Sequence, residues 1–544
     1  MRTSSARSSP SVREFITSAP KSWFWLLCVD LYPAVVAGCL PWSTTAVSIF
    51  MIVWLIVLLP TLDRSFLVSL KQPASLSALL FFALALFGTL WADSTWMVRL
   101  NGIAPVVKFL AIPLLLFHFE RSQRGHWVFI AFLASSVLLL AYSWLIFFVP
   151  AGKIFDTEAS GVPVKNYIDQ SYEFTLCAFA IAGFLPALIG DRRFALAAGC
   201  VTLIAAFFFN LVFVVLARTA LVYMPVLLLL FSARFLSRTS TALLCLGAMT
   251  LAAAVWFTSP YLRDRVEGIA SEYTNYREIG KPTSTGERLE YWRVSLESIA
   301  QAPLFGHGTG STKELFDREA MGKTGAWSRS IRNPHNQTLY VTIQWGMLGC
   351  VILYVTWYFH LALFRGPDVA AWIGLLIVVQ NFVSSLLNSH LFDFSEGWIY
   401  VLGVGVAGGM TTHAGVLDSA RQGRRSTKEY AVERVGLVVP AIVCLSSAVV
   451  LFLLIHCFTV YHAGSGGIFP AIATLLLPVA AEIYWMIAIW QQTGSTLNVL
   501  TIMCFVCLLL VFSSWTLARV AGLNVGRKLA APLGRASLPS SVEH

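Results

Sequence analysis

Two arginines in this 544-residue chain have the side-chain chemistry of an anion clamp. Arg218 lies in a tight turn between two apolar runs, and Arg288 lies near the start of a predicted helix. A guanidinium presents a planar fork of N–H donors that matches phosphate oxygens. Both residues also have a structural interpretation. Arg218 can be an arginine that snorkels at a membrane interface, and Arg288 can form an ion pair with Glu287 or Glu290.

The third candidate is His335, in the sequence Asn333-Pro334-His335-Asn336-Gln337. Asn followed by Pro is typical of a helix N-cap and first helical residue, so we expect His335 at the second helical position. The positive end of a helix disfavours an imidazolium, and a neutral ring there can accept a proton. A lone histidine is often only structural. The expected grouping of His335 with the two arginines favours a catalytic role.

Three more residues are candidates for substrate binding: Lys108, Gln337 and Asp393. Lys108 lies about a third of the way into an apolar run, where it can either snorkel outward or line a polar cavity. Asp393 lies in a short loop and is a possible partner for one of the cations. Gly306, Gly308 and Gly310 alternate in one segment, but no strand precedes them, so a turn is favoured over a phosphate-binding loop.

The composition requires that most of these residues be positioned by membrane helices. Hydrophobic residues make up 57% of the chain and charged residues 12%, whereas soluble proteins have about 25% charged residues. Each membrane-spanning helix needs about 20 apolar residues, and the alternation of a β-barrel is absent. The net charge of +10 does not indicate a nucleic-acid partner, because the Lys and Arg residues are scattered through short loops. They indicate topology instead.

The apolar runs predict an all-α polytopic membrane protein with about 12 core transmembrane helices and about 3 further C-terminal apolar helices. A large loop separates the ninth and tenth core helices. The predicted organisation is a cytoplasmic tail at 1–22, spans one to nine at 23–257, the loop at 258–335, spans ten to twelve at 336–412, a basic cytoplasmic linker at 413–434, a C-terminal transmembrane extension at 435–518 and a tail at 519–544.

The distribution of basic residues predicts the orientation of these spans. With a cytoplasmic N-terminus, inside segments carry eighteen Lys and Arg and the short outside loops carry four, in agreement with the positive-inside rule. The loop at 258–335 then lies outside. From residue 287 onward it contains an amphipathic helix, with apolar side chains at Leu289, Trp292, Leu296 and Ile299. Simple alternation places the basic C-terminal tail outside, in conflict with the same rule.

Four short motifs occur in a fixed order along residues 20–412: Arg218-Thr219 in a turn, Arg288-x-x-x-Trp292 in the loop helix, Pro303-Leu-x-Gly-x-Gly308, and Pro334-His335-Asn336 opening the next span. In this order and topology, the chain resembles the O-antigen ligase and polymerase superfamily. The last three apolar runs are not covered by the resemblance.

The resemblance implies a metal-independent, inverting glycosyltransferase of the membrane glycosyltransferase type that needs no cofactor. Its donor would be a glycan on undecaprenyl pyrophosphate, and in the ligase branch its acceptor would be the core sugar of lipid A. The active site would face the periplasm in the inner membrane of a Gram-negative bacterium, among membrane lipids. By motif, the family's histidine corresponds to His335 and its two functional arginines to Arg288 and Arg218.

Three other functions remain open at this point. An O-antigen polymerase would use the same donor with a second lipid-linked glycan as acceptor, and a protein O-oligosaccharyltransferase would use a protein acceptor. A polysaccharide transporter is a different class, in which charges would line a pathway through several spans. Here the charged candidates gather at one predicted membrane face, which favours an enzyme.

Overall fold

The computed structural model describes residues 23–150, 161–215, 217–258, 260–279, 283–322 and 333–421, the helix at 478–493 and a few isolated positions. Every regular element in these ranges is a helix, which confirms the all-α prediction. The predicted N-terminal tail, most of the linker, most of the C-terminal extension and the last tail lie outside the described residues. The chain divides into two units, residues 1–187 with 200–425 and residues 188–199 with 426–544.

A helix lies in each of the twelve predicted core runs. These helices are α2 (Trp23–Cys39), α3 (Thr44–Leu58), α5 (Pro73–Phe87), α6 (Trp96–Val107) with α7 (Ala111–Phe119), α8 (His126–Phe148), α9 (Tyr167–Ala182), α11 (Phe194–Phe213), α12 (Ala220–Phe235), α13 (Arg238–Thr258), α17 (Gln337–Ala362), α18 (Val369–Ser384) and α19 (Phe394–Arg421). Shorter elements are η2 (Leu59–Thr61), α4 (Arg64–Ser69), η3 (Lys108–Leu110) and α10 (Leu185–Gly190), and α22 (Pro478–Thr493) lies in the second unit.

Six helical stretches in the described part of the chain are long and apolar enough to cross a membrane. They are Thr44–Thr61, Trp96–Phe119, His126–Phe148, Tyr167–Gly190, Phe194–Phe213 and Gln337–Ala362. Four shorter apolar helices, α2, α5, α12 and α18, accompany them. The total of twelve core and three C-terminal spans therefore stays a prediction.

Helix α3 illustrates how these helices use two apolar faces. One face is buried in the first unit and carries Val47, Met51, Trp54 and Leu58. The opposite face exposes Ile49, Ile52 and Ile56, each more than half exposed. In water, exposed isoleucines at helical spacing would be unfavourable. A helix that is apolar on all sides is therefore suited to a lipid environment.

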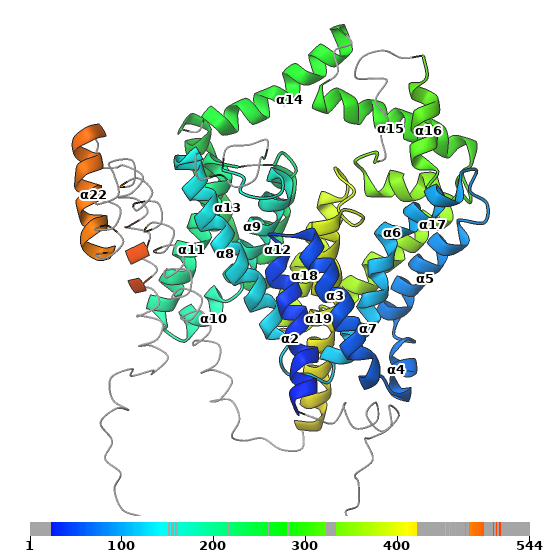
Figure 1. The fold of residues 1–544 in the computed structure, drawn as a ribbon, viewed down its shortest axis with the longest axis horizontal. Coiled ribbons are helices and arrows are strands. Elements are labelled where there is room, and N and C mark those ends of the chain that lie inside the picture. Colours follow the sequence, from blue (N-terminus) through cyan, green and yellow to red (C-terminus); the bar gives the residue numbers. More distant parts are fainter. Residues whose placement is uncertain are drawn as a thin grey trace, which may run out of the picture. The chain divides into compact units, whose positions relative to one another are not determined.

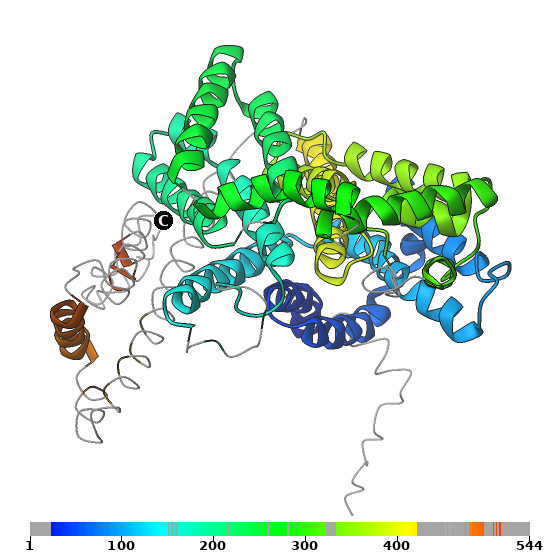
Figure 2. The ribbon, with the colours of Figure 1, turned by 90° about the horizontal axis from the view of Figure 1, so that it is seen from above.

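The core of the first unit is formed by helices that pack in pairs. Helix α7 packs on α19, α2 packs on both α3 and α8, and α5 packs on α17. Figure 2 shows α2 and α3 side by side. Large aromatic side chains fill the space between α5 and α17, where Phe81 and Trp345 meet edge to face with ring centroids 5.7 Å apart.

Helix α9 begins at Tyr167, in a polar stretch of the sequence. The side-chain oxygen of Asn166 accepts hydrogen bonds from the backbone N–H groups of Ile168 and Asp169 at 2.8 and 2.9 Å. This N-cap satisfies two of the four free donors of the first turn and extends the helix into a polar stretch.

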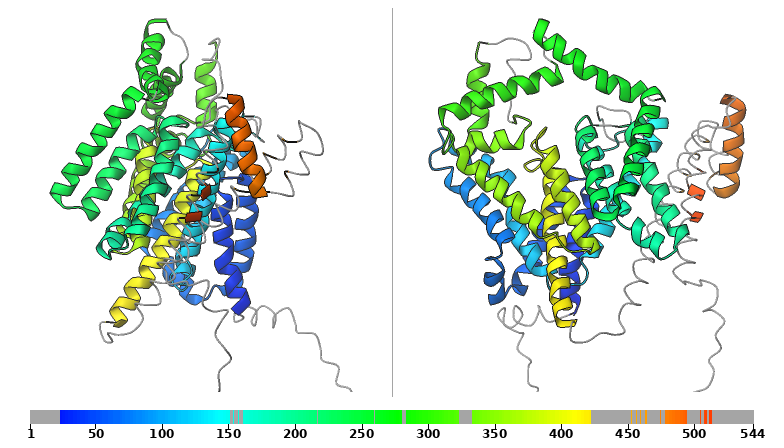
Figure 3. Two further views of the ribbon diagram at one scale, coloured as in Figure 1. Left: turned by 90° about the vertical axis from the view of Figure 1, so that its left-hand side faces the viewer. Right: turned by 180° about the vertical axis from the view of Figure 1, so that it is seen from behind.

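The predicted outside loop contains three helices: α14 (Pro260–Ile279), α15 (Ser284–Gln301) and α16 (Thr312–Ala320). They lie across one end of the helical bundle of the first unit (Figures 1 and 3). Helix α15 is the predicted amphipathic helix, and it begins at Ser284. Residues 323–332 of the loop are not described.

The segment after α15 is anchored on a break in α17. Gly346 has a φ of +61° within α17, and Gly306 has a φ of +64°. A Cβ on Gly346 would lie 2.3 Å from the carbonyl carbon of Leu304, so a larger residue cannot be accommodated. The N–H groups of His307 and Gly308 donate to the carbonyls of Ile343 and Gln344 at 2.9 and 2.7 Å. The glycine segment is thus a turn, as predicted. The amides of His307 and Gly308 donate to backbone carbonyls of α17.

The topology can be tested by labelling a residue of the loop. Met321, at the end of α16, is 74% exposed. In a background without the ten native cysteines, Met321→Cys should react with a membrane-impermeant maleimide while the inner membrane is intact. Gln123→Cys, exposed in the predicted cytoplasmic loop between α7 and α8, is the matched control and should react only after permeabilisation. The opposite pattern would invert the topology.

Candidate active site

A bidentate ion pair joins the bundle to the loop helices. Arg218 lies just before α12, and its Nη1 and Nη2 donate to the two carboxylate oxygens of Glu272 on α14 at 2.8 and 2.7 Å. Glu272 Oε2 also accepts from the backbone N–H and the hydroxyl of Thr285 at 3.0 and 2.7 Å. Because Thr285 lies in the first turn of α15, one carboxylate connects three elements. Sequence reasoning missed Glu272, since nothing in its local sequence distinguishes it from the other acidic residues of the loop.

The charge on this pair is strongly stabilised. The hydrogen bonds from Arg218 lower the pKa of Glu272 from 4.5 to about 2, despite the opposing effect of burial. The same contact raises the pKa of Arg218. Thr283 caps α15 by accepting from the N–H of Gly286 at 3.1 Å. The N-terminal end of α15 is therefore fixed by a cap and by a bidentate ion pair.

Arg288 lies near the start of α15, as predicted, and belongs to its second turn because Thr283 is the N-cap. Among the described residues, no hydrogen bond or ion pair to the Arg288 guanidinium is found. The predicted ion pair with Glu287 or Glu290 is not formed, and Glu290 instead accepts from Arg293 at 2.9 Å. Burial lowers the pKa of Arg288, and the charge of Arg218 adds to this effect, whereas Tyr167 and Glu272 oppose it. Arg288 is thus a half-buried cation near the Arg218–Glu272 ion pair.

His335 differs from its predicted position. Asn336, not Asn333, is the N-cap of α17, and its Oδ1 accepts from the N–H of Leu339 at 3.0 Å. His335 therefore precedes the helix, with a φ of +53°. Few residues other than glycine adopt this conformation, which costs about 1–3 kcal/mol and needs support from its surroundings. Asn333 supplies some of it, because its Oδ1 accepts from the His335 N–H at 2.8 Å and from the Ser389 hydroxyl at 2.6 Å.

The His335 ring faces helix α15 on one side and the loop between α18 and α19 on the other. Tyr291 stacks on it, with ring centroids 6.1 Å apart and an interplanar angle of 25°. Tyr291 lies three residues after Arg288, so both side chains are on the same face of α15. Burial lowers the pKa of His335, and the charge of Arg288 lowers it further, against a hydrogen bond with Asn388 that raises it. Burial, rather than a helix dipole, therefore favours the neutral ring.

The three predicted substrate-binding residues meet at the backbone of Phe392 and Asp393, just before α19. Lys108 is buried where η3 interrupts the helical stretch of α6 and α7, and its Nζ donates to the carbonyls of Phe392 and Asp393 at 3.2 and 2.5 Å. Burial raises the pKa of the Asp393 carboxyl to about 7, against the effect of Lys108. Gln337 is fully buried, and its Oε1 accepts from the Phe392 N–H at 3.3 Å. Their substrate-binding role stays a prediction.

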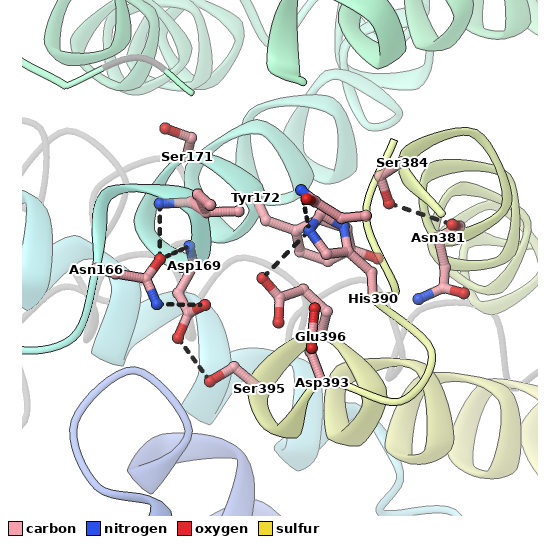
Figure 4. A network of polar contacts seen from close by, with 12 residues as sticks. Asn166, Asp169, Ser171, Tyr172, Asn381, Ser384, His390, Asp393, Ser395 and Glu396 are labelled. Atoms are coloured by element: carbon pink, nitrogen blue, oxygen red, sulfur yellow. Dashed lines mark hydrogen bonds and ion pairs between the residues drawn. The ribbon is translucent and has the colours of Figure 1, made fainter. Parts of the chain in front are cut away.

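A second histidine of this region was not predicted from the sequence. His390 is 1% exposed, and its ring contacts that of Tyr172 edge to face with centroids 5.5 Å apart. Figure 4 shows it between Tyr172 of α9 and Glu396 of α19, whose Oε1 is 3.9 Å from His390 Nε2. Burial, with the nearby Arg288 and His335, lowers the pKa of His390 to about 3. Its place in a short apolar loop gave no sequence signal.

The site therefore combines cations with a neutral imidazole at one end of the bundle. In the described part of the chain, no group of three or more His, Cys, Asp and Glu side chains is arranged to hold a metal ion.

Residues 202–354 match the family model described as O-Antigen ligase. The chain carries an O-antigen ligase family domain. This domain contains Arg218, Arg288, His335 and Gln337, whereas Lys108, His390 and Asp393 lie outside the matched residues.

One relative among curated proteins supplies a partial match. It is an uncharacterized protein of Haemophilus influenzae, 28% identical over 112 residues, which are 20% of this chain and 28% of that protein. The chain thus covers little more than a quarter of that relative's length. Because that relative is uncharacterized, the match gives no information about the activity.

The Glu272 ion pair can be tested through hydrogen exchange. Glu272→Gln keeps the size of the side chain but removes its charge, so the backbone amides of Thr285 and Gly286 should exchange several-fold faster. Because the folded-state pKa lies below the ordinary value of 4.5, the pair stabilises the fold fully above that value. In the wild type, protection of these amides, corrected for intrinsic rates, should fall between pH 4.5 and 2.

The matched control is Glu297→Gln, which removes an exposed partner of Arg293 on the same helix. Such surface pairs contribute little to stability, about 0–1 kcal/mol. This control should leave the protection of the first turn of α15 unchanged. Equal protection in wild type and Glu272→Gln across the pH range would show that the pair does not hold the helix.

Proposed function

We propose that this protein is an O-antigen ligase that transfers a glycan from undecaprenyl pyrophosphate to the core sugar of lipid A. The single observation that carries the proposal is the Arg288–Tyr291 face of α15. It presents a guanidinium that has no hydrogen-bonded partner among the described residues, and Tyr291 of the same face stacks on the His335 ring. The ligase-family domain and the membrane-type helices support the same assignment. The reaction would take place at the periplasmic face of the inner membrane of a Gram-negative bacterium.

The two arginines have different parts in this mechanism. The donor contains a pyrophosphate, and negative charge grows on it as the glycosidic bond breaks. Arg288 is suited to bind this group directly, because a half-buried guanidinium with no hydrogen bond to the described residues gains most from an anion. Arg218 is already paired with Glu272. It contributes positive charge nearby and holds the helix that carries Arg288.

His335 acts as the general base. The acceptor hydroxyl attacks the anomeric carbon, and its proton passes to the free ring nitrogen of His335. The bond between the anomeric carbon and the phosphate oxygen breaks, and its electron pair leaves with undecaprenyl pyrophosphate. Attack opposite the leaving group inverts the configuration of the sugar. Base catalysis of this kind contributes about 10²- to 10⁴-fold in rate. No metal or cofactor is assigned a role.

The remaining predicted residues have supporting roles in this proposal. Gln337 is buried at the start of α17, two residues after His335, and its Nε2 has no hydrogen-bond partner among the described residues. In this proposal, the amide donates to a hydroxyl of the bound sugar. Lys108 donates to the backbone carbonyl of Asp393, and we assign both residues to sugar binding rather than to the pyrophosphate.

The acceptor distinguishes an O-antigen ligase from an O-antigen polymerase. A polymerase would use the same arginines and the same base with a second lipid-linked glycan. Deletion of the gene followed by gel analysis of lipopolysaccharide tests the difference. For a ligase, we expect bare lipid A-core together with polymerised glycan that stays on its lipid carrier. Core molecules that carry single repeats would identify a polymerase, and an unchanged pattern would reject both.

Two variants of the purified protein should separate binding from chemistry. His335→Ala should lose at least about 100-fold in transfer rate while it still binds the donor. Arg288→Lys keeps the charge but loses the bidentate fork, so it should bind the donor more weakly at equal expression. Donor binding can be measured with a labelled undecaprenyl pyrophosphate glycan in detergent.

Arg293→Lys is the matched control for Arg288→Lys, because Arg293 lies on the same helix and pairs with surface carboxylates. It should bind and transfer like the wild type. A rate for His335→Ala within a few-fold of wild type would exclude the base, whereas loss of donor binding in that variant would reassign His335 to the pyrophosphate.

A further inference from the structure

The turn that follows α15, residues 303–306, presents an apolar surface that the proposed catalytic site does not use. We propose that this turn is immersed in the membrane leaflet on the side of the loop helices, where its side chains contact lipid. Its partner is the bilayer itself, at the boundary between headgroups and acyl chains. The inference concerns an interaction surface, and it does not depend on the proposed function.

The two large apolar side chains of the turn are mostly exposed. Leu304 is 65% exposed and Phe305 is 61% exposed. No Asp, Glu, Lys or Arg occurs from residue 302 to residue 312, so the turn and the glycine segment after it carry no acidic or basic charge. Neighbouring large apolar side chains without charges among them are unfavourable in water. They mark a contact with another protein or with a membrane.

The apolar surface continues onto helix α17, which indicates that the contact is with lipid. The N–H of Leu348 donates to the carbonyl of Leu304 at 3.3 Å, directly after the break at Gly346. Beyond the break, residues 347–359 contain no Asp, Glu, Lys or Arg. The exposed side chains of this part lie three or four residues apart and therefore share one face: Met347, Val351, Tyr354 and Tyr358. An uncharged face of this kind, on a stretch apolar enough to cross a membrane, is suited to contact lipid.

Tryptophans from neighbouring elements are placed as expected for the headgroup level. Trp91 follows α5, and its Nε1 donates to the carbonyl of Phe305 at 3.1 Å. Trp96 opens the membrane-length stretch Trp96–Phe119 and is exposed, with the guanidinium of Arg99 4.6 Å from its ring centroid. Such side chains have an apolar body and a polar tip, and they are enriched at membrane interfaces. Helix α5 packs on both α6 and α17 (Figure 1), so the three helices form one flank of the bundle.

The lipid contact does not extend along α15. Leu296 is also exposed, but it lies on a face of α15 that carries Arg293 and Glu297, which form an ion pair at 2.6 Å. A single exposed leucine among charges is normal on a surface that faces water. The immersed turn therefore fixes only the C-terminal end of α15 at the membrane, while the helix itself lies in water. On the proposed function, this keeps Arg288 close to the level of a lipid-linked pyrophosphate.

Spin labelling of the full-length protein tests the proposal. In a background without the native cysteines, Leu304→Cys carries a nitroxide, and the protein is reconstituted in vesicles of phosphatidylethanolamine and phosphatidylglycerol. Oxygen concentrates among acyl chains, whereas a hydrophilic nickel chelate stays in water. Compared with a label at Met321→Cys, which is the control for water, the Leu304 label should show a several-fold higher ratio of oxygen to nickel collisions. Val351→Cys, on the exposed face of α17, is the control for lipid and should resemble Leu304→Cys.

Three results would overturn the proposal. A Leu304 label that behaves like the Met321 label would place the turn in water. Low collision rates with both reagents would show that protein covers the turn, either a second copy or another partner. A Val351 label that favours the nickel chelate would remove the lipid contact that the turn continues. If Leu304→Cys does not fold, Phe305→Cys gives the same reading. None of these measurements needs glycan transfer, so failure of the proposed function is a separate result.

Discussion

The bidentate contact between Arg218 and Glu272 determines where the loop helices lie on the bundle. Arg218 comes directly before α12, so its position is fixed by a bundle helix, whereas Glu272 belongs to α14 of the loop. The same carboxylate accepts two hydrogen bonds from Thr285 in the first turn of α15. Through this one group, the bundle sets the starting point of the helix that carries Arg288. A charge-assisted, bidentate contact is geometrically specific, which a hydrophobic contact between helices is not.

The other end of α15 is fixed by shape rather than charge. The turn that follows it rests on the break in α17, where Gly306 and Gly346 let two backbones approach each other closely. The N–H of Met347 donates to the carbonyl of Pro303 at 2.8 Å across this contact. Helix α15 is thus held at both ends, and its middle passes over the start of α17. That placement brings the ring of Tyr291 onto His335.

The sequence predicts the helices and the main catalytic candidates better than it predicts their contacts. Long apolar runs indicate helices directly, and the motifs at Arg218, Arg288 and His335 mark the same end of the bundle. The span was predicted to begin at residue 336, close to the start of α17, but its N-cap was predicted wrongly, because both Asn333 and Asn336 are good caps. Asn336 also donates to the carbonyl of Leu386, a tertiary contact that the sequence does not indicate. Glu272 and His390 could not be found, since their contacts are with residues distant in the sequence.

On the proposed function, the charges of the site are also coupled in a way that orders the reaction. In the free protein, the cation Arg288 lowers the pKa of His335 and thus weakens it as a base. On the proposed function, a pyrophosphate bound to Arg288 brings at least two negative charges next to that cation. Its field would cancel the effect of Arg288 and raise the pKa of the imidazole, because an opposite charge favours the protonated ring. The base would therefore become stronger only when the donor is in place. Such coupling would make the removal of the acceptor proton depend on the presence of the donor pyrophosphate, which is the leaving group.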